Sequence, residues 1–147
     1  MTNFTLYTIG FTKKNAKSFF FLLERHNVKR IIDVRLNNRS QLAGFTKADD
    51  LSFFVQRILG ADYIHRPDLA PTSEILDDYK KKQITWKEYE NQFILLLKQR
   101  DTIKELPLEF FDKACLLCSE PEPNQCHRRL VAEQVKCIFP KLKIVHL

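Results

Sequence analysis

Apolar and polar residues are arranged in two kinds of segment, which follow one another along the chain. Short apolar runs predict strands, and longer segments with apolar residues every three to four positions predict amphipathic helices. Five runs have strand character: Thr5–Gly10, Arg30–Arg35, Asp62–Arg66, Lys113–Ser119 and Lys143–Leu147. Because helical segments separate these runs, we expect an α/β fold, a single domain over residues 1–147, with a mainly parallel sheet of about five strands and helices on both faces.

Four helical segments are predicted between the strands, and the polar stretch at residues 68–84 is expected to be partly helical. The segments are Asn15–Asn27, one that begins near Thr46 and ends at Gly60, one that begins at Thr85, and Cys126–Phe139. Thr46 with Asp49, and Thr85 with Glu88, have the spacing of a capping box, in which two side chains bond the free backbone N–H groups of the helix start.

Composition and charge narrow the class of protein. The 147 residues include four Cys and carry a formal net charge of +6. No signal peptide or membrane-spanning run is visible, so we expect a cytoplasmic protein with reduced thiols and no membrane partner. The positive charge favours a small anionic ligand or nucleic acid as partner, although a solvated basic surface accounts for it equally well.

Chemically capable side chains recur where the predicted strands end. In parallel α/β sheets, ligands bind outside the carboxyl ends of the strands. The residues at or just after these ends include Gly10, Asp33, Arg35, His65, Cys118 and Glu120, and Ser40 lies in the loop after the second strand, a plausible lid. Asp33 and Arg35 alternate with Val34 and therefore lie on one side of their strand, where they face a ligand or form a structural ion pair.

The segment from Cys118 to Arg128 concentrates most of this chemistry. Cys118 and Glu120 end a strand, and Cys126, His127 and Arg128 follow a stretch of turn-forming residues and begin a helix. A helix start favours anions and lowers the pKa of a thiol such as that of Cys126. His127 can transfer protons near neutral pH, and Arg128 can bind a phosphate or carboxylate through two hydrogen bonds.

Structural roles for the same residues stay open. His127 lies on an apolar helical stripe and can point to the sheet and bond backbone, and Cys118 can act as a small buried apolar residue. Arg128 can pair with Glu120 or Glu133. Three further expectations concern the cysteines alone: Cys115 should face away from Cys118 on its strand, Cys137 should be core, and a lasting disulfide is not expected.

A metal site is a further alternative. Cys118, Cys126 and His127 could converge with His65, but the two close ligand pairs that are usual for zinc are absent. We therefore expect no metal and no cofactor. The candidate catalytic residues are Cys118, Glu120, Cys126 and His127, and the candidate ligand-binding residues are Gly10, Asp33, Arg35, Ser40, His65 and Arg128.

Several motifs together resemble the domain-of-unknown-function family 488. They are Thr8-Ile9-Gly10, Asp33-Val34-Arg35, Ser40 with Gly44-Phe45, Tyr63 with His65, Leu116-Leu117-Cys118 with Glu120, Cys126-His127-Arg128 and Val145-His146. The resemblance implies a small α/β protein and supplies no established activity. The chain departs from many relatives at Phe11-Thr12, Asn37-Asn38 and Ala70-Pro71, which affects the rim of the pocket.

Three functions are compatible with these observations. The first is an enzyme that uses Cys118 or Cys126 with His127 and Glu120 on a phosphorylated or nucleotide-like substrate. The alternatives are a nucleic-acid-binding module, whose affinity would fall steeply with salt, and a protein that binds a ligand without turnover. The spacing of Cys126 and Arg128 is not that of a Cys-x5-Arg phosphate cradle, and the chain has no P-loop or GxGxxG motif.

Overall fold

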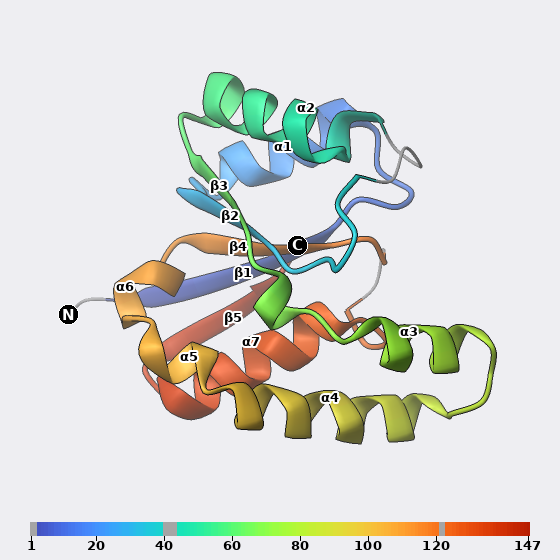
Figure 1. Cartoon of the computed structure of the whole chain (residues 1–147). Helices are drawn as coiled ribbons and strands as arrows, with labels where there is room; N and C mark the ends of the chain where they lie inside the picture. Colours follow the sequence, from blue (N-terminus) through green and yellow to red (C-terminus); the bar gives the residue numbers. More distant parts are fainter. Residues whose placement is uncertain (1–2, 40–43, 121–122) are drawn as a thin grey trace.

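A five-stranded, all-parallel sheet forms the centre of the molecule (Figure 1). The computed structural model describes residues 3–39, 44–120 and 123–147. The strands are β1 (Phe4–Gly10), β2 (Arg30–Asp33), β3 (Asp62–His65), β4 (Ala114–Cys118) and β5 (Leu142–His146). Their order across the sheet is β3-β2-β4-β1-β5. The predicted α/β fold is confirmed, and the predicted strand ends differ from the observed ones by at most two residues.

Helices cover both faces of the sheet, as predicted (Figure 1). One face carries α1 (Ala16–Arg25), α2 (Ala48–Phe54) and the π-helical turn η2 (Val55–Leu59). The other carries α3 (Ser73–Lys80), α4 (Trp86–Arg100), α5 (Thr102–Glu105) and α7 (His127–Ile138), and α6 (Leu108–Phe111) leads into β4. Two short 3-10 turns, η1 (Gly44–Thr46) and η3 (Pro67–Leu69), complete the elements. In the part of the chain that is described, every helix is too short or too polar to cross a bilayer.

The sheet separates two apolar cores. Ile32 and Cys118 pack on the face of α4 and α7, and Ile31 and Cys115 pack on the face of α1 and α2. The prediction that Cys115 and Cys118 face opposite sides is therefore confirmed, as strand alternation requires. The prediction that Cys137 is core is wrong, because this thiol near the end of α7 is exposed.

The capping predictions have different outcomes. Thr85 and Glu88 form the predicted capping box at the start of α4. Gly60 ends η2 with φ of 60°, a left-handed conformation that glycine adopts without strain. The box predicted at Thr46 and Asp49 is wrong: Lys47 precedes α2 without a capping side chain, and Thr46 is buried in η1.

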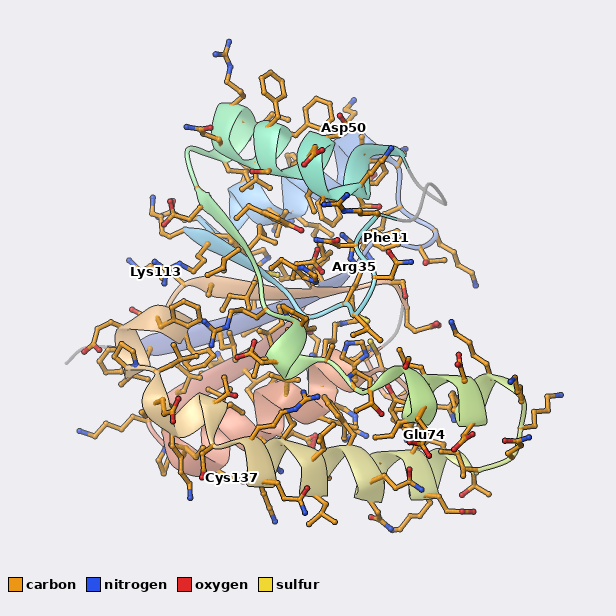
Figure 2. The ribbon with its side chains drawn as sticks, viewed as in Figure 1. Phe11, Arg35, Asp50, Glu74, Lys113 and Cys137 are labelled. Atoms are coloured by element: carbon orange, nitrogen blue, oxygen red, sulfur yellow. The ribbon has the colours of Figure 1, made fainter. Side chains whose placement is uncertain are left out.

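The path of the chain creates a crevice at the carboxyl ends of the strands. After β1 and β2 it turns to the face of α1 and α2, and after β3 and β4 it turns to the opposite face. Because β4 lies between β2 and β1, the segment after β4 diverges from both neighbours. Such a divergence creates a crevice at the carboxyl ends of parallel strands. Figure 2 shows Phe11 and Arg35, which follow β1 and β2, between the two helical layers.

Candidate functional site

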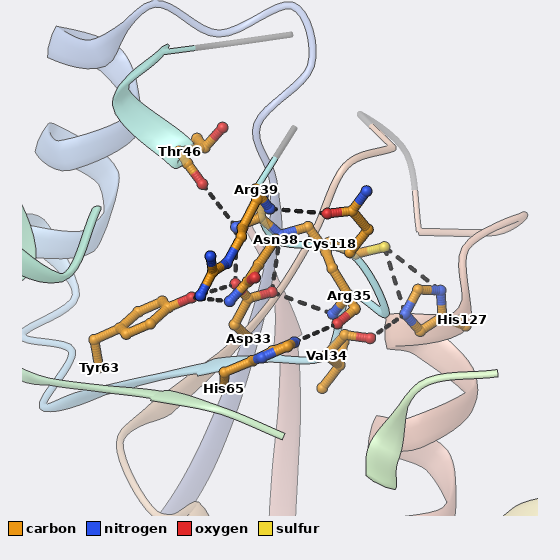
Figure 3. Close-up of polar contacts among 11 residues, drawn as sticks. Asp33, Val34, Arg35, Asn38, Arg39, Thr46, Tyr63, His65, Cys118 and His127 are labelled. Atoms are coloured by element: carbon orange, nitrogen blue, oxygen red, sulfur yellow. Dashed lines mark hydrogen bonds and ion pairs between the residues drawn. The ribbon is translucent and has the colours of Figure 1, made fainter. Parts of the chain in front are cut away.

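Asp33, Arg35 and Tyr63 form a buried set of polar contacts, which we call the acid–guanidinium network (Figure 3). Arg35 donates from Nε to Asp33 Oδ1 over 2.9 Å and from Nη2 to Asp33 Oδ2 over 2.8 Å. The Tyr63 hydroxyl donates to Asp33 Oδ2 over 2.5 Å, and Arg35 Nη2 also donates to the Thr46 carbonyl over 2.7 Å. The structural ion pair that the sequence left open is thus present, in the two-pronged geometry that suits guanidinium and carboxylate.

The network fixes the protonation of its own members. Burial alone would lower the pKa of Arg35, but hydrogen bonds and charge from Asp33 outweigh it and raise that pKa. Burial, followed by the Asp33 charge, raises the pKa of Tyr63, so the phenol stays protonated and keeps donating. His65 supports the same loop, because its Nε2 contacts the Arg35 carbonyl over 2.7 Å.

One nitrogen of Arg35 is left over. The side chain is 6% exposed, and Nη1 is buried without a hydrogen-bond partner among the described residues. The guanidinium carbon also lies 5.3 Å from the centre of the Phe11 ring, within the range of a cation–π contact. A buried charged donor without a partner lowers the stability of the fold unless a ligand or a water accepts its hydrogen bond.

Cys118, Cys126 and His127 form a second buried group, which we call the thiol–imidazole cluster. Their possible ligand atoms all lie within 4.8 Å of one another. The Cys118 sulfur is 3.5 Å from Nδ1 and 3.6 Å from Nε2 of His127 (Figure 3). Nε2 is also 2.6 Å from the Val34 carbonyl, which can only accept, so Nε2 carries the proton and Nδ1 is free to accept or to bind a metal.

The position of the Cys118 sulfur limits what His127 does at rest. A sulfur almost equidistant from both ring nitrogens lies over the ring, because in the ring plane it would collide with Cε1. The thiol and Nδ1 are therefore not aligned for proton transfer until one side chain rotates. The predicted structural role of His127, a bond to backbone beneath the sheet edge, is present at the same time.

The two thiols differ in acidity. A hydrogen bond from Cys126 is the main cause that lowers the pKa of Cys118, and the Ser119 and Glu120 backbone N–H groups add to it against the effect of burial. The interaction with Cys118, followed by burial, raises the pKa of Cys126. The sequence assigned the lowered pKa to Cys126, and this is wrong. Cys126 does precede α7 as its N-cap, but its thiol makes no capping bond.

Arg128 and Gly10 join the segment after β4 to β1. Arg128 is fully buried, donates from Nη1 to the Glu120 carbonyl over 2.5 Å, and lies 3.3 Å through Nε from the Thr8 hydroxyl. A Cβ on Gly10 would lie 1.6 Å from the Glu120 carbonyl oxygen, so this strand end needs glycine. These contacts hold the loop that carries Cys118 and Glu120, while ligand binding by Gly10 and Arg128 stays a prediction.

A cavity of about 400 Å³ lies at this edge of the sheet. Arg35, Glu120 and all members of the thiol–imidazole cluster line it, together with Phe11. Its outer side is formed by α3 and α4, with Tyr79, Trp86 and Tyr89, which we call the aromatic wall, and with Lys80 at the end of α3. Trp86 and Tyr89 stack with ring centres 4.8 Å apart, and the Tyr79 ring is 5.6 Å from that of Trp86.

The predicted site residues are thus partly gathered. Arg35, Cys118, Glu120, Cys126 and His127 line one cavity. Asp33 and His65 support Arg35 from behind, and the described lining includes neither of them, nor Gly10 or Arg128. The prediction for Ser40 lies outside the described residues. Its ligand-binding role, like the roles of the other candidates, stays a prediction.

Sequence reasoning did not assign the aromatic wall or Tyr63 to the site. Trp86 and Tyr89 are three residues apart in α4 and therefore lie on one face of that helix, whose start the Thr85 capping box marks. Their relation to Cys118 depends on how α3 and α4 fold back over the strand ends, which no local pattern reveals. Tyr63 reaches Asp33 because β3 pairs with β2, a pairing that follows from the strand order.

Comparison with known proteins places the chain in a family. No curated protein and no solved structure matches it significantly. The family described as "Domain of unknown function DUF488" matches residues 15–135, a span that includes the acid–guanidinium network and the thiol–imidazole cluster. This span covers well over half of the sequence, and the chain therefore belongs to the DUF488 family.

Proposed function

We propose that the protein binds a small anionic, nucleotide-like molecule in the cavity and acts on it through the thiol–imidazole cluster. The observation that carries this proposal is the composition of one cavity. An incompletely bonded Arg35, three aromatic rings and an acidic thiol share its surface. Perturbed titratable groups that converge in a pocket are typical of functional sites.

The aromatic wall supports a flat, unsaturated ring as part of the ligand. Tyr79, Trp86 and Tyr89 contact one another and line the cavity. Base-on-aromatic stacking contributes roughly 1–3 kcal/mol per base and tolerates any nucleobase. A cavity of about 400 Å³ lies within the range of small-molecule sites.

Two cations support an anionic group on the same ligand. Arg35 lines the cavity, its guanidinium is oriented by Asp33 and Thr46, and its Nη1 is buried without a partner among the described residues. Lys80 lines the outer part of the cavity. Arg35 recognises a phosphate or carboxylate through directed hydrogen bonds, whereas Lys80 contributes as a mobile point charge.

The thiol–imidazole cluster supplies the chemistry. Cys118 is the thiol that ionises first, because Cys126 and two backbone N–H groups stabilise its thiolate. A thiolate, and not a thiol, is both nucleophile and metal ligand. The exposed carboxylate of Glu120 lines the same cavity and can exchange protons with a bound ligand.

A fluorescence titration tests the proposal, because Trp86 is the single tryptophan of the chain and lines the cavity. We expect adenosine monophosphate to change Trp86 emission with saturation, and adenosine without its phosphate to bind at least about tenfold more weakly. Lys80→Gln should weaken binding roughly 2–5-fold, as an exposed charge contact does. Lys81→Gln, at a neighbouring exposed residue outside the cavity lining, is the matched control and should have no effect.

The contrary results are equally specific. An absence of any change in emission up to ~1 mM nucleotide would contradict a nucleotide-like ligand. A dissociation constant at that limit corresponds to a binding free energy of only about 4 kcal/mol. Equal binding of adenosine and its monophosphate would contradict the anionic requirement. Much tighter, steeply salt-dependent binding of an oligonucleotide would favour a nucleic-acid-binding module instead.

A further inference from the structure

We propose that Cys118, Cys126 and His127 form a binding site for Zn²⁺, with a fourth coordination position open to the cavity. The first part of this inference stands on the geometry of the cluster alone. The second part rests on the proposed function, since the open position would receive an oxygen of the anionic ligand.

The donor atoms suit zinc in kind and spacing. Thiolate sulfur and imidazole nitrogen are its usual ligands, with bonds of about 2.3 Å and about 2.0–2.1 Å. Tetrahedral angles with these bonds place sulfur and nitrogen about 3.5 Å apart, and the Cys118 sulfur is 3.5 Å from His127 Nδ1. All three donor atoms lie within 4.8 Å of one another, so one ion can reach them after small side-chain rotations.

His127 is already oriented as a metal-binding histidine. Ligating histidines usually donate their second ring N–H to a carboxylate or backbone carbonyl, which fixes the tautomer. Here Nε2 donates to the Val34 carbonyl over 2.6 Å, which leaves the lone pair of Nδ1 free to bind a metal. Because the Cys118 sulfur now lies over the ring, entry of an ion requires a rotation of Cys118 or a tilt of the imidazole.

Charge balance favours an ion at this position. Two ionised cysteines and a neutral histidine compensate the charge of Zn²⁺, so a buried complex carries no net charge. Cys118 and Cys126 are 3% and 2% exposed, which shields a complex from solvent.

The surroundings indicate an open site and not a closed structural one. Structural zinc sites use four protein ligands, whereas catalytic sites use three and leave one position for water or substrate. Within the described residues the cluster has three members, and each of them lines the cavity. Arg35 lines the same cavity, so an anion that it holds lies within the compartment that the open position faces.

Metal analysis of the purified, native protein is the first test. We expect one Zn²⁺ per chain, and after exchange we expect one Co²⁺ with the intense visible and near-ultraviolet bands of tetrahedral thiolate coordination. Cys118→Ser and Cys126→Ser should each weaken metal binding at least about 100-fold. Loss of a residue that only hydrogen-bonds to a metal ligand already weakens binding by up to about 100-fold. Cys137→Ser, which changes an exposed thiol outside the cluster, is the matched control and should bind normally.

A second measurement needs no variant and therefore does not depend on how a variant folds. Alkylation of the wild-type protein is followed thiol by thiol after treatment with a chelator and again after addition of Zn²⁺. We expect Zn²⁺ to protect Cys118 and Cys126 and to leave Cys137 reactive. Substoichiometric metal, or equal protection of Cys137, would overturn the metal site. Nucleotide binding without metal would then leave the proposed function intact, and metal binding without nucleotide binding would leave only the metal site.

Discussion

The acid–guanidinium network and the thiol–imidazole cluster lie at the same edge of the sheet but differ in how far their polar groups are satisfied. In the network, Asp33 accepts from Arg35 and Tyr63, and these bonds hold all of its members in place. In the cluster, His127 contacts the Val34 carbonyl, and the Cys118 sulfur lies close to the imidazole ring, to Cys126 and to two backbone N–H groups. The network therefore contributes chiefly to stability and orientation, and the cluster keeps its capacity for chemistry.

The largest effect is expected from breaking the network at its centre. Asp33→Ala leaves the buried Arg35 guanidinium without its counter-charge, which should lower the free energy of unfolding by about 3–5 kcal/mol. Asp62→Ala is the matched control, because Asp62 is 74% exposed and pairs with Arg30 over 3.5 Å. Its cost should stay below about 1 kcal/mol. Denaturant unfolding of both variants measures the difference, and similar costs would contradict the structural role of the network.

A second change acts on the support of the cluster. Gly10→Ala places a Cβ against the Glu120 carbonyl, so the loop after β4 must shift. We expect the free energy of unfolding to fall by about 1–3 kcal/mol, as it does at other overpacked positions. Gly44→Ala, where an added Cβ meets nothing within 4 Å, is the control. An unchanged unfolding midpoint for Gly10→Ala would show that this close approach is not maintained in solution.

Tyr63→Phe weakens the network without removing its charges. The loss of the hydrogen bond to Asp33 should cost about 1.5–3 kcal/mol, because the acceptor is charged. The raised pKa of Tyr63 adds a pH effect with a defined sign. Above the ordinary tyrosine pKa of 10.0 the unfolded chain loses the phenol proton while the folded chain keeps it, so stability falls as pH rises. Tyr63→Phe should show a shallower decline than the wild type above pH 10.0, and identical slopes would contradict the assignment.

The smallest effect on stability is expected within the cluster. Cys126→Ala should cost about 1 kcal/mol, comparable to losing one buried methyl group. Its effect on reactivity should be larger, because Cys118 loses the hydrogen bond that contributes most to lowering its pKa. Alkylation against pH should then show a higher pKa for Cys118 in the variant. An unchanged profile would mean that Cys126 does not stabilise the Cys118 thiolate.

Much of this architecture was predictable from the sequence, because it depends on local patterns. Short continuous apolar runs such as that ending at Cys118 define buried strands, and strand ends define the edge at which ligands bind. Thr85 with Glu88 and the glycine at position 60 mark helix ends by local hydrogen bonds and backbone conformation. Gathering Arg35, Cys118 and Cys126 at one edge required only that the strands be parallel.

The remainder depended on long-range packing. The short helices α5 and α6 lack a full amphipathic period, and Pro107 separates them, so no pattern marked them. Thr46 has the sequence spacing of a helix cap, but its backbone carbonyl instead accepts a hydrogen bond from the Arg35 side chain. The acidity of Cys118 relative to Cys126 depends on which thiol donates to the other, and that is decided by side-chain placement across the segment after β4.

The most direct test of the central claim, that the cavity contains a thiol ready to react, is the alkylation rate of each cysteine against pH in native, metal-free protein. Peptide mass spectrometry separates the four thiols, and the exposed Cys137 is the internal reference. The account predicts that Cys118 reacts with an apparent pKa below 9.0, that Cys126 reacts far more slowly, and that adenosine monophosphate protects Cys118. If Cys118 stays inert until the protein unfolds while Cys137 reacts normally, the cavity has no accessible thiolate and the account is contradicted.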